Sequence, residues 1–349
     1  MKKTGFYRNG LAKVVTTTLM CATIVLGTAT ASAANAPSKE DVRKFLRPME
    51  IPQGKGNIGT PERVKLGKAL FFDPRLSGSN FISCATCHHP GLGWSDGQPT
   101  AMGHGMDVLA RATPTILNTA YQRFQTWDGR ERTLEKQALG PIVDGGEMAQ
   151  DIDSLLIELM AIKGYVEMFE AAYPGEGIVP KTVGKAIAVF ERTIVSSESA
   201  FDRWLKGVDG VMSESAQRGF GLFKGKANCV ACHDGFNFSD NGFHNIGLKN
   251  MEDMGRYAIK PVKVLKGAFK TPTLRDITLT APYMHNGAYT TLEEVVDHYN
   301  AGGFKNAGTL DPNMKPLNLS KKERQDVVEF MKSLTGDPVE VTVPVLPVK

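Results

Sequence analysis

The stretch Cys84-Ala85-Thr86-Cys87-His88 decides the fold of this chain, and it recurs as Cys229-Val230-Ala231-Cys232-His233. In a C-x-x-C-H sequence the two thiols can form thioether bonds to the vinyl groups of a haem, and the histidine is then the proximal ligand of the iron. One copy alone is also compatible with a redox dithiol or half of a zinc site. Two copies, with Cys21 as the only other cysteine, predict two covalently bound haem c groups.

Residues 1–33 have the pattern of a secretion signal. Four basic residues precede position 14, an apolar stretch covers 14–27, and Ala31-Ser32-Ala33 is a small-residue cleavage site. The apolar stretch is short for a bilayer span, so a retained anchor is the less favoured alternative. We therefore expect a periplasmic protein without a permanent membrane anchor, from which Cys21 is removed with the leader.

The net charge of +4 comes from this leader. Without its four basic residues the charge falls to about zero. The basic composition therefore indicates neither a nucleic-acid partner nor binding to an anionic membrane surface.

Helical patterns dominate the rest of the chain. A capping box at Ser38 and Asp41 predicts a helix that ends at Phe45, and Thr60 followed by Pro61 predicts one that ends at Phe72. Strand patterns of period 2 are scarce. We expect a mostly α, loop-rich fold with little β-structure and further helices over 152–162, 179–196, 213–222, 291–300 and 320–334.

A weak internal repeat surrounds the two haem motifs. Gly67-Lys68-Ala69-Leu70-Phe71 before the first corresponds to Gly219-Phe220-Gly221-Leu222-Phe223 before the second. Trp94-Ser95-Asp96 is likewise echoed by Phe238-Ser239-Asp240. These echoes predict two cytochrome c-like haem domains in tandem, with a join within 198–211. The predicted ranges are 34–200 for the N-terminal domain, 201–336 for the C-terminal domain and 337–349 for an extended tail.

The sixth ligand of a haem iron decides between electron transfer and catalysis. His104 is a candidate because it lies between Gly103 and Gly105, where little packing would restrain it. Such a histidine could ligate the first haem in one state and leave it in another. A solvated loop histidine is the alternative.

From about Val64 to Leu334 the sequence resembles the bacterial di-haem cytochrome c peroxidase family, which includes the MauG-type enzymes. Both C-x-x-C-H motifs lie where that family has them. The resemblance is specific for the family and less so for the branch within it. The matching stretches are Arg111, Pro114-Thr115, Leu117-Asn118, Trp127-Asp128-Gly129-Arg130, Leu134-Glu135, Gln137-Ala138, Gly140-Pro141-Ile142, Glu147-Met148, the stretch from Lys270 to Arg275, and the stretch from Ala281 to Gly287.

The resemblance implies roles for four residues around the first, peroxidatic haem. His104 falls on the displaceable distal histidine, Gln137 and Glu147 on the distal-pocket pair, and Trp127 on the tryptophan between the haems. Cleavage of the O–O bond needs a group that takes a proton from one oxygen and returns it to the other, and a carboxylate can do both. Without the resemblance, Glu147 and Gln137 would be ordinary surface residues and Trp127 a core residue.

The sixth ligand of the second haem distinguishes two branches of this family. The resemblance implies a methionine there in the electron-accepting peroxidases and a tyrosine in MauG-type enzymes, and this chain has Tyr299. A phenolate stabilises ferric and higher states, whereas a thioether stabilises ferrous iron. Met284 is the rival ligand, and a core tyrosine with an ordinary hydrogen bond is the alternative for Tyr299.

A calcium ion is a weaker implication of the resemblance. Thr280 and Pro282 match two backbone oxygen donors of the family, but Ala112 stands where an asparagine donor is usual. Because calcium prefers six to eight oxygens, the loss of one donor leaves the ion an open alternative.

Three functions follow from these observations. The first is a periplasmic peroxidase that reduces hydrogen peroxide with electrons from a small redox protein, a cytochrome c or a cupredoxin. The second is a MauG-like enzyme that uses peroxide to oxidise residues of a partner protein. The third is a non-catalytic di-haem electron carrier. Tyr299 favours the second function and His104 the first, and a homodimer is one of the assemblies left open.

Replacing both Cys84 and Cys87 by alanine is expected to remove one covalent haem and all peroxide turnover, because the first haem is the proposed catalytic one. Intact mass and a peroxide assay measure the two effects. His88→Gly is the control, which should keep both haems attached and lose turnover. A double variant that retains two haems would contradict this interpretation of the motif.

Overall fold

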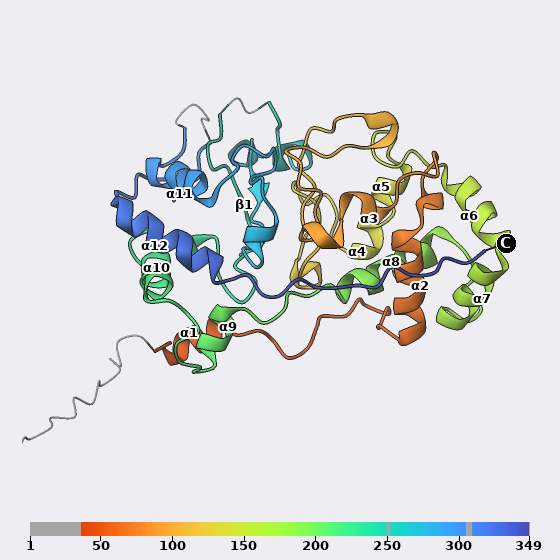
Figure 1. Ribbon diagram of the computed structural model, residues 1–349. Coiled ribbons are helices and arrows are strands. Elements are labelled where there is room, and N and C mark those ends of the chain that lie inside the picture. The colour runs from red at the N-terminus through yellow and green to blue at the C-terminus, as the bar shows by residue number, and fades with distance from the viewer. Residues whose placement is uncertain (1–35, 250–251, 305–308, 349) are drawn as a thin grey trace, which may run out of the picture. The chain divides into compact units, whose positions relative to one another are not determined.

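The computed structural model describes residues 36–249, 252–304 and 309–348. This part of the chain is mostly helical, as predicted, and none of its helices is long and apolar enough to span a membrane (Figure 1). The predicted leader lies outside the described residues. Strands β1 (Phe243–His244) and β2 (Phe269–Lys270) form an antiparallel pair. The α-helices are α1 (Lys39–Phe45), α2 (Pro61–Phe72), α3 (Cys84–Cys87), α4 (Leu134–Gln137), α5 (Gly140–Val143), α6 (Ile152–Met160), α7 (Lys163–Ala172), α8 (Pro180–Arg192), α9 (Ala200–Leu205), α10 (Glu214–Lys224), α11 (Leu292–Ala301) and α12 (Lys321–Lys332).

Side-chain caps fix several helix starts where the sequence indicated them. The Ser38 hydroxyl accepts the Asp41 N–H at 3.1 Å, and the Asp41 carboxylate accepts the Ser38 N–H at 3.1 Å. Thr60 caps α2 in the same way. The sequence did not indicate α7 or α9, and α9 occupies the predicted join, where Ser199 caps it. The join is therefore partly helical.

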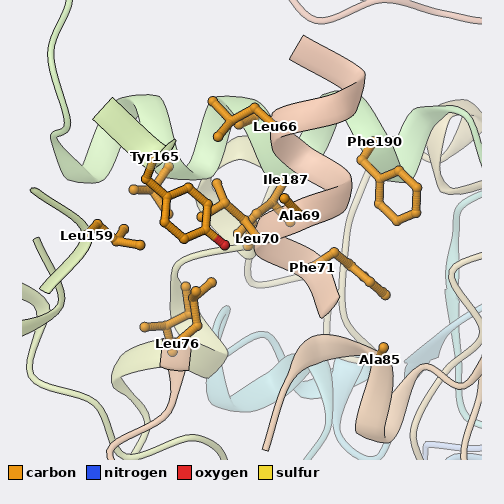
Figure 2. Close-up of a cluster of buried hydrophobic side chains, with 14 of the residues drawn as sticks. Leu66, Ala69, Leu70, Phe71, Leu76, Ala85, Leu159, Tyr165, Ile187 and Phe190 are labelled. Atoms are coloured by element: carbon orange, nitrogen blue, oxygen red, sulfur yellow. The ribbon is translucent and has the colours of Figure 1, made fainter. Parts of the chain in front are cut away.

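Two separate hydrophobic clusters stabilise this part of the chain. In the first, Leu66 and Leu70 of α2 pack with Ile187 of α8 (Figure 2). The second gathers aromatic residues, among them Phe220 of α10 and Phe330 of α12. Most residues of the first cluster come from the predicted N-terminal domain, and most residues of the second come from the predicted C-terminal domain. Helix α1 is an exception, because its buried phenylalanine belongs to the second cluster. The boundary at residue 200 stays a prediction.

A glycine brings two helix backbones together in each cluster. A Cβ on Gly67 of α2 would overlap the carbonyl oxygen of Ala186 in α8, and a Cβ on Gly219 of α10 would overlap that of Asp326 in α12. Only a residue without a side chain allows these approaches. Gly67 and Gly219 are corresponding residues of the sequence repeat. The two modules therefore share this helix packing as well as the sequence pattern.

The C-terminal tail returns to the first cluster. Residues 337–348 contain no helix or strand, as predicted for an extended tail, and they run back towards α7 (Figure 1). Val339 and Val341 pack against the first cluster, and the Arg75 guanidinium donates to the Pro347 carbonyl at 3.0 Å. The tail therefore extends from the second cluster across to the first.

Gly219→Ala is expected to destabilise the protein by roughly 1–3 kcal/mol, because the added methyl group forces α10 away from α12. Gly221→Ala is the matched control on the same helix. A Cβ there meets nothing within 4 Å, so it should leave stability unchanged or raise it by up to about 1 kcal/mol. Chemical denaturation measures both, and equal effects of the two substitutions would contradict the packing argument.

Candidate haem site

Both C-x-x-C-H motifs line one cavity of about 1010 Å³. This volume is at the upper end of the range for a small-molecule site. Cys84 and His88 face the cavity from one motif, and Cys229 and His233 face it from the other. One cavity is therefore lined by all the groups that the sequence assigned to haem attachment.

Both motif histidines are oriented in the way that iron ligation requires. His88 Nδ1 lies 3.3 Å from the carbonyl oxygen of Trp94, and His233 Nδ1 lies 2.9 Å from that of Phe238. When Nδ1–H donates to a carbonyl, Nε2 keeps its lone pair for a metal. Burial lowers the pKa of both histidines, which favours this neutral form. The residues present thus fit two haem groups.

The cysteines do not have the character of a redox dithiol. Burial raises the pKa of Cys84 and Cys229, and it raises that of Cys87 to about 11. Reactive and zinc-binding cysteines instead need a stabilised thiolate. This environment disfavours the two alternatives that a single motif left open.

The repeat extends to the turns that hold the histidines. Ser95 donates to the Thr113 carbonyl at 2.8 Å, and the Thr113 hydroxyl donates to Asp96 at 2.6 Å. The second module repeats both bonds: Ser239 donates to the Thr271 carbonyl at 2.7 Å, and the Thr271 hydroxyl donates to Asp240 at 2.8 Å.. The Thr-Pro-Thr sequences at 113–115 and 271–273 were a signal of this correspondence.

Glu147 and Gln137 line the cavity, as the proposed distal pair requires. Partial burial raises the pKa of the Glu147 carboxyl, and the nearby charge of Asp144 adds to the effect. A carboxyl with a raised pKa accepts and returns a proton closer to neutral pH. The geometry is compatible with acid–base chemistry at Glu147, while its role stays a prediction.

The segment around His104 differs from the expected free loop. The His104 N–H donates to the carbonyl oxygens of Gly146 and Glu147, at 3.1 and 2.8 Å. A Cβ on Gly103 would overlap the Gly146 carbonyl oxygen. The expectation of little packing was therefore wrong for the backbone, because Gly103 packs closely against the backbone of Gly146. Gly103 lines the cavity but His104 does not, so this structure does not bring His104 to the other proposed ligands.

Trp127 faces the cavity and contacts an aromatic pair from the second module. Its indole N–H donates to the Ala112 carbonyl at 2.9 Å, and its ring centroid lies 6.3 Å from that of His285. His285 in turn stacks on Phe269 at 3.6 Å. Sequence reasoning missed His285 and Phe269. The sequence did contain a signal for His285, because His285-Asn286-Gly287 resembles Trp127-Asp128-Gly129. In the structure each of these turns follows a residue with positive φ.

Tyr299 lines the cavity from α11, and Met284 lines it from the preceding turn. Burial is the main cause that raises the pKa of the Tyr299 phenol. Tyr299 lies eight residues after the helix cap Thr291, just as Pro141 lies eight residues after the cap Thr133. Both Tyr299 and Pro141 line the cavity. The two residues at this spacing differ, because Tyr299 has a group that can ligate iron and Pro141 has none.

The residues of the possible calcium site also line the cavity, namely Thr280, Pro282 and Ala112. The carbonyl oxygen of Ala112 already accepts the Trp127 indole N–H. Calcium stays a prediction. Another group of potential ligands includes His244, but its two nitrogens face Asp240 at 2.9 Å and Asp311 at 2.7 Å. The hydrogen bond to Asp240 is the main reason that the pKa of His244 is raised to about 11, so the two aspartates favour the protonated imidazole.

Comparison with known proteins agrees with this site. A family model described as di-haem cytochrome c peroxidase matches residues 61–210, and one described as cytochrome c matches residues 216–335. The chain is 47% identical over 323 residues to the methylamine utilization protein MauG of Methylorubrum extorquens. The aligned region covers 92% of this chain and 91% of that protein. The chain is 36% identical over 296 residues to the cytochrome c551 peroxidase of Nitrosomonas europaea, which covers 82% and 85%. A crystal structure of a MauG-like protein associated with microbial copper homeostasis matches with a TM-score of 0.78 and 30% identity, covering 83% of this chain and 95% of that one.

Proposed function

Because the chain belongs to the di-haem cytochrome c peroxidase family of oxidoreductases, we propose that it is a periplasmic MauG-like enzyme that uses hydrogen peroxide to oxidise residues of a partner protein. The observation that carries this proposal is Tyr299, which faces the same cavity as the second haem motif. The 47% identity to a MauG protein supports the same branch. The leader pattern of residues 1–33 supports the periplasm.

Each haem has its attachment and proximal residues in this chain. Cys84, Cys87 and His88 would hold the first haem, and Cys229, Cys232 and His233 the second, with Tyr299 as its sixth ligand. When bound, the first haem would supply the chemistry for the two-electron reduction of peroxide, in which H₂O₂, two electrons and two protons give two water molecules. In the proposed reaction both electrons come from side chains of the partner protein.

The distal residues of the first module handle the protons. The Glu147 carboxylate accepts a proton from one peroxide oxygen and returns it to the oxygen that leaves as water. Gln137 holds the peroxide by hydrogen bonds from its amide. Pro141 stands at the same spacing from its helix cap as Tyr299 does and has no group that could ligate iron, so it would leave the sixth position of the first haem free for peroxide.

The contacts of Trp127 support a role in electron transfer between the modules. Its ring contacts His285, and its indole N–H is fixed by the Ala112 carbonyl. A fixed ring between the two haem motifs is suited to repeated electron transfer, because nothing needs to rearrange at each step. We propose that oxidising equivalents pass through Trp127.

Glu147→Gln is expected to keep both haems and to slow the reaction with peroxide by on the order of a hundredfold or more, since the proton acceptor is lost. Stopped-flow mixing measures the rate constant. The basic form of Glu147 is needed, so in the wild type this constant should fall as the pH drops through a pKa above the ordinary value of 4.5. In the variant, this fall of the rate constant at low pH should be absent. A wild-type rate constant in the variant would remove Glu147 from the mechanism.

Tyr299→Phe is expected to open the sixth position of the second haem and change its ferric spectrum without loss of haem. Tyr299→Met should raise the potential of that haem, because a thioether replaces a phenolate. Met284→Leu is the control and should leave both haem spectra nearly unchanged. The reverse pattern, a silent Tyr299→Phe with a disrupted Met284→Leu, would identify Met284 as the ligand.

A cytochrome-fed peroxidase is the second candidate function, supported by the 36% identity to a cytochrome c551 peroxidase. There the electrons would come from a small periplasmic redox protein. One experiment separates the two functions: the holoenzyme is mixed with peroxide and either a reduced cytochrome c or a co-expressed partner protein. Covalent change in the partner, measured by mass, supports the MauG-like function, and steady oxidation of the cytochrome alone supports the second.

A further inference from the structure

Lys270 places a positive charge inside the protein. It lies on β2, only 6% of its surface is exposed, and it lines the cavity shared by the two haem motifs. Its backbone N–H donates to the Trp127 carbonyl at 2.8 Å, which fixes the strand beside that tryptophan. Lysine is almost never buried this deeply unless it is paired.

The partner of this ammonium group is neutral. Lys270 Nζ donates to the side-chain oxygen of Gln122 at 2.8 Å, and an amide carries no charge that could offset a buried cation. No ion pair joins Lys270 to an acidic residue in the part of the chain that the structure describes. Burial is the one influence on its pKa, which is lowered to about 8, so the group still carries its proton at neutral pH.

The other cations that line the cavity differ from Lys270. Arg111 pairs with Asp253 and Asp128, each at 2.7 Å, and Arg130 pairs with Asp128 at 2.8 Å. Lys315 is exposed to solvent, where water stabilises its charge. Lys270 is thus the buried cation of the cavity wall without an acidic partner among the described residues.

We propose that the Lys270 ammonium binds a propionate of one of the two haems. A propionate is the anion that the cofactor itself brings into this cavity, and an ion pair there would stabilise both buried charges. This inference needs haem binding but not the proposed reaction with peroxide. A positive charge close to a haem disfavours the ferric state, so Lys270 should also raise the reduction potential of the haem that it contacts.

The test is a redox titration of the holoenzyme with Lys270→Met, which removes the charge and keeps much of the side-chain length. We expect two haems by mass and a lower potential for one of them. The equilibrium constant for its reduction should fall by on the order of tenfold, or about 59 mV for a one-electron couple. Lys263→Met is the control, because Lys263 is an exposed lysine on the same segment. A shift no larger than that of the control would overturn the proposal.

Infrared spectroscopy tests the contact without any loss of folding. Wild-type holoenzyme and Lys270→Arg, which keeps the charge, are prepared with carbon-13 in the haem propionate carboxylates. The reduced-minus-oxidised spectrum should show a carboxylate band shifted by an ion pair in the wild type, and a similar shift in the arginine variant. Propionate bands at the position of the solvated anion in the wild type would overturn the proposal, whatever Lys270→Met does.

Discussion

The close crossing of two helices, made possible by one glycine in each module, is the contact on which the rest of the structure depends. Gly67 lets α2 touch the backbone of α8, and Gly219 lets α10 touch that of α12. α2 and α10 each lead into a haem motif. Because interiors are packed as densely as crystals, a helix held at backbone contact has little freedom to shift. The crossing therefore fixes where the chain enters each motif.

From that fixed entry the two modules build the same proximal side and different distal sides. The turns after the motifs have matching hydrogen bonds, so His88 and His233 have the same orientation. The position eight residues after each helix cap differs, with Pro141 in one module and Tyr299 in the other. A duplicated scaffold of this kind would need no new fold to hold one open and one ligated iron, as we propose, since a single side chain can change the chemistry.

The sequence predicted the features that local chemistry determines. The caps at Ser38 and Thr60, the two motifs and the extended tail all depend on residues within a few positions of one another. The prediction of a loosely packed loop around His104 was wrong because Gly103 contacts Gly146, which lies more than forty residues away in the sequence. The burial of Lys270 carried no local signal either, since its surroundings come from distant parts of the chain.

Burial acts in one direction on the ionisable groups of the cavity and yet leads to different outcomes. It disfavours the charged form of Glu147, Tyr299 and Lys270 alike. Under the two proposals above, a ferric ion would stabilise the Tyr299 phenolate and a haem carboxylate would stabilise the Lys270 ammonium. Glu147 lies near charges of both signs, because Asp144 disfavours its ionisation and Arg130 favours it less strongly. On these proposals, the charges of Tyr299 and Lys270 are paired with the cofactor, and the Glu147 carboxyl is the group that exchanges its proton, as peroxide chemistry requires.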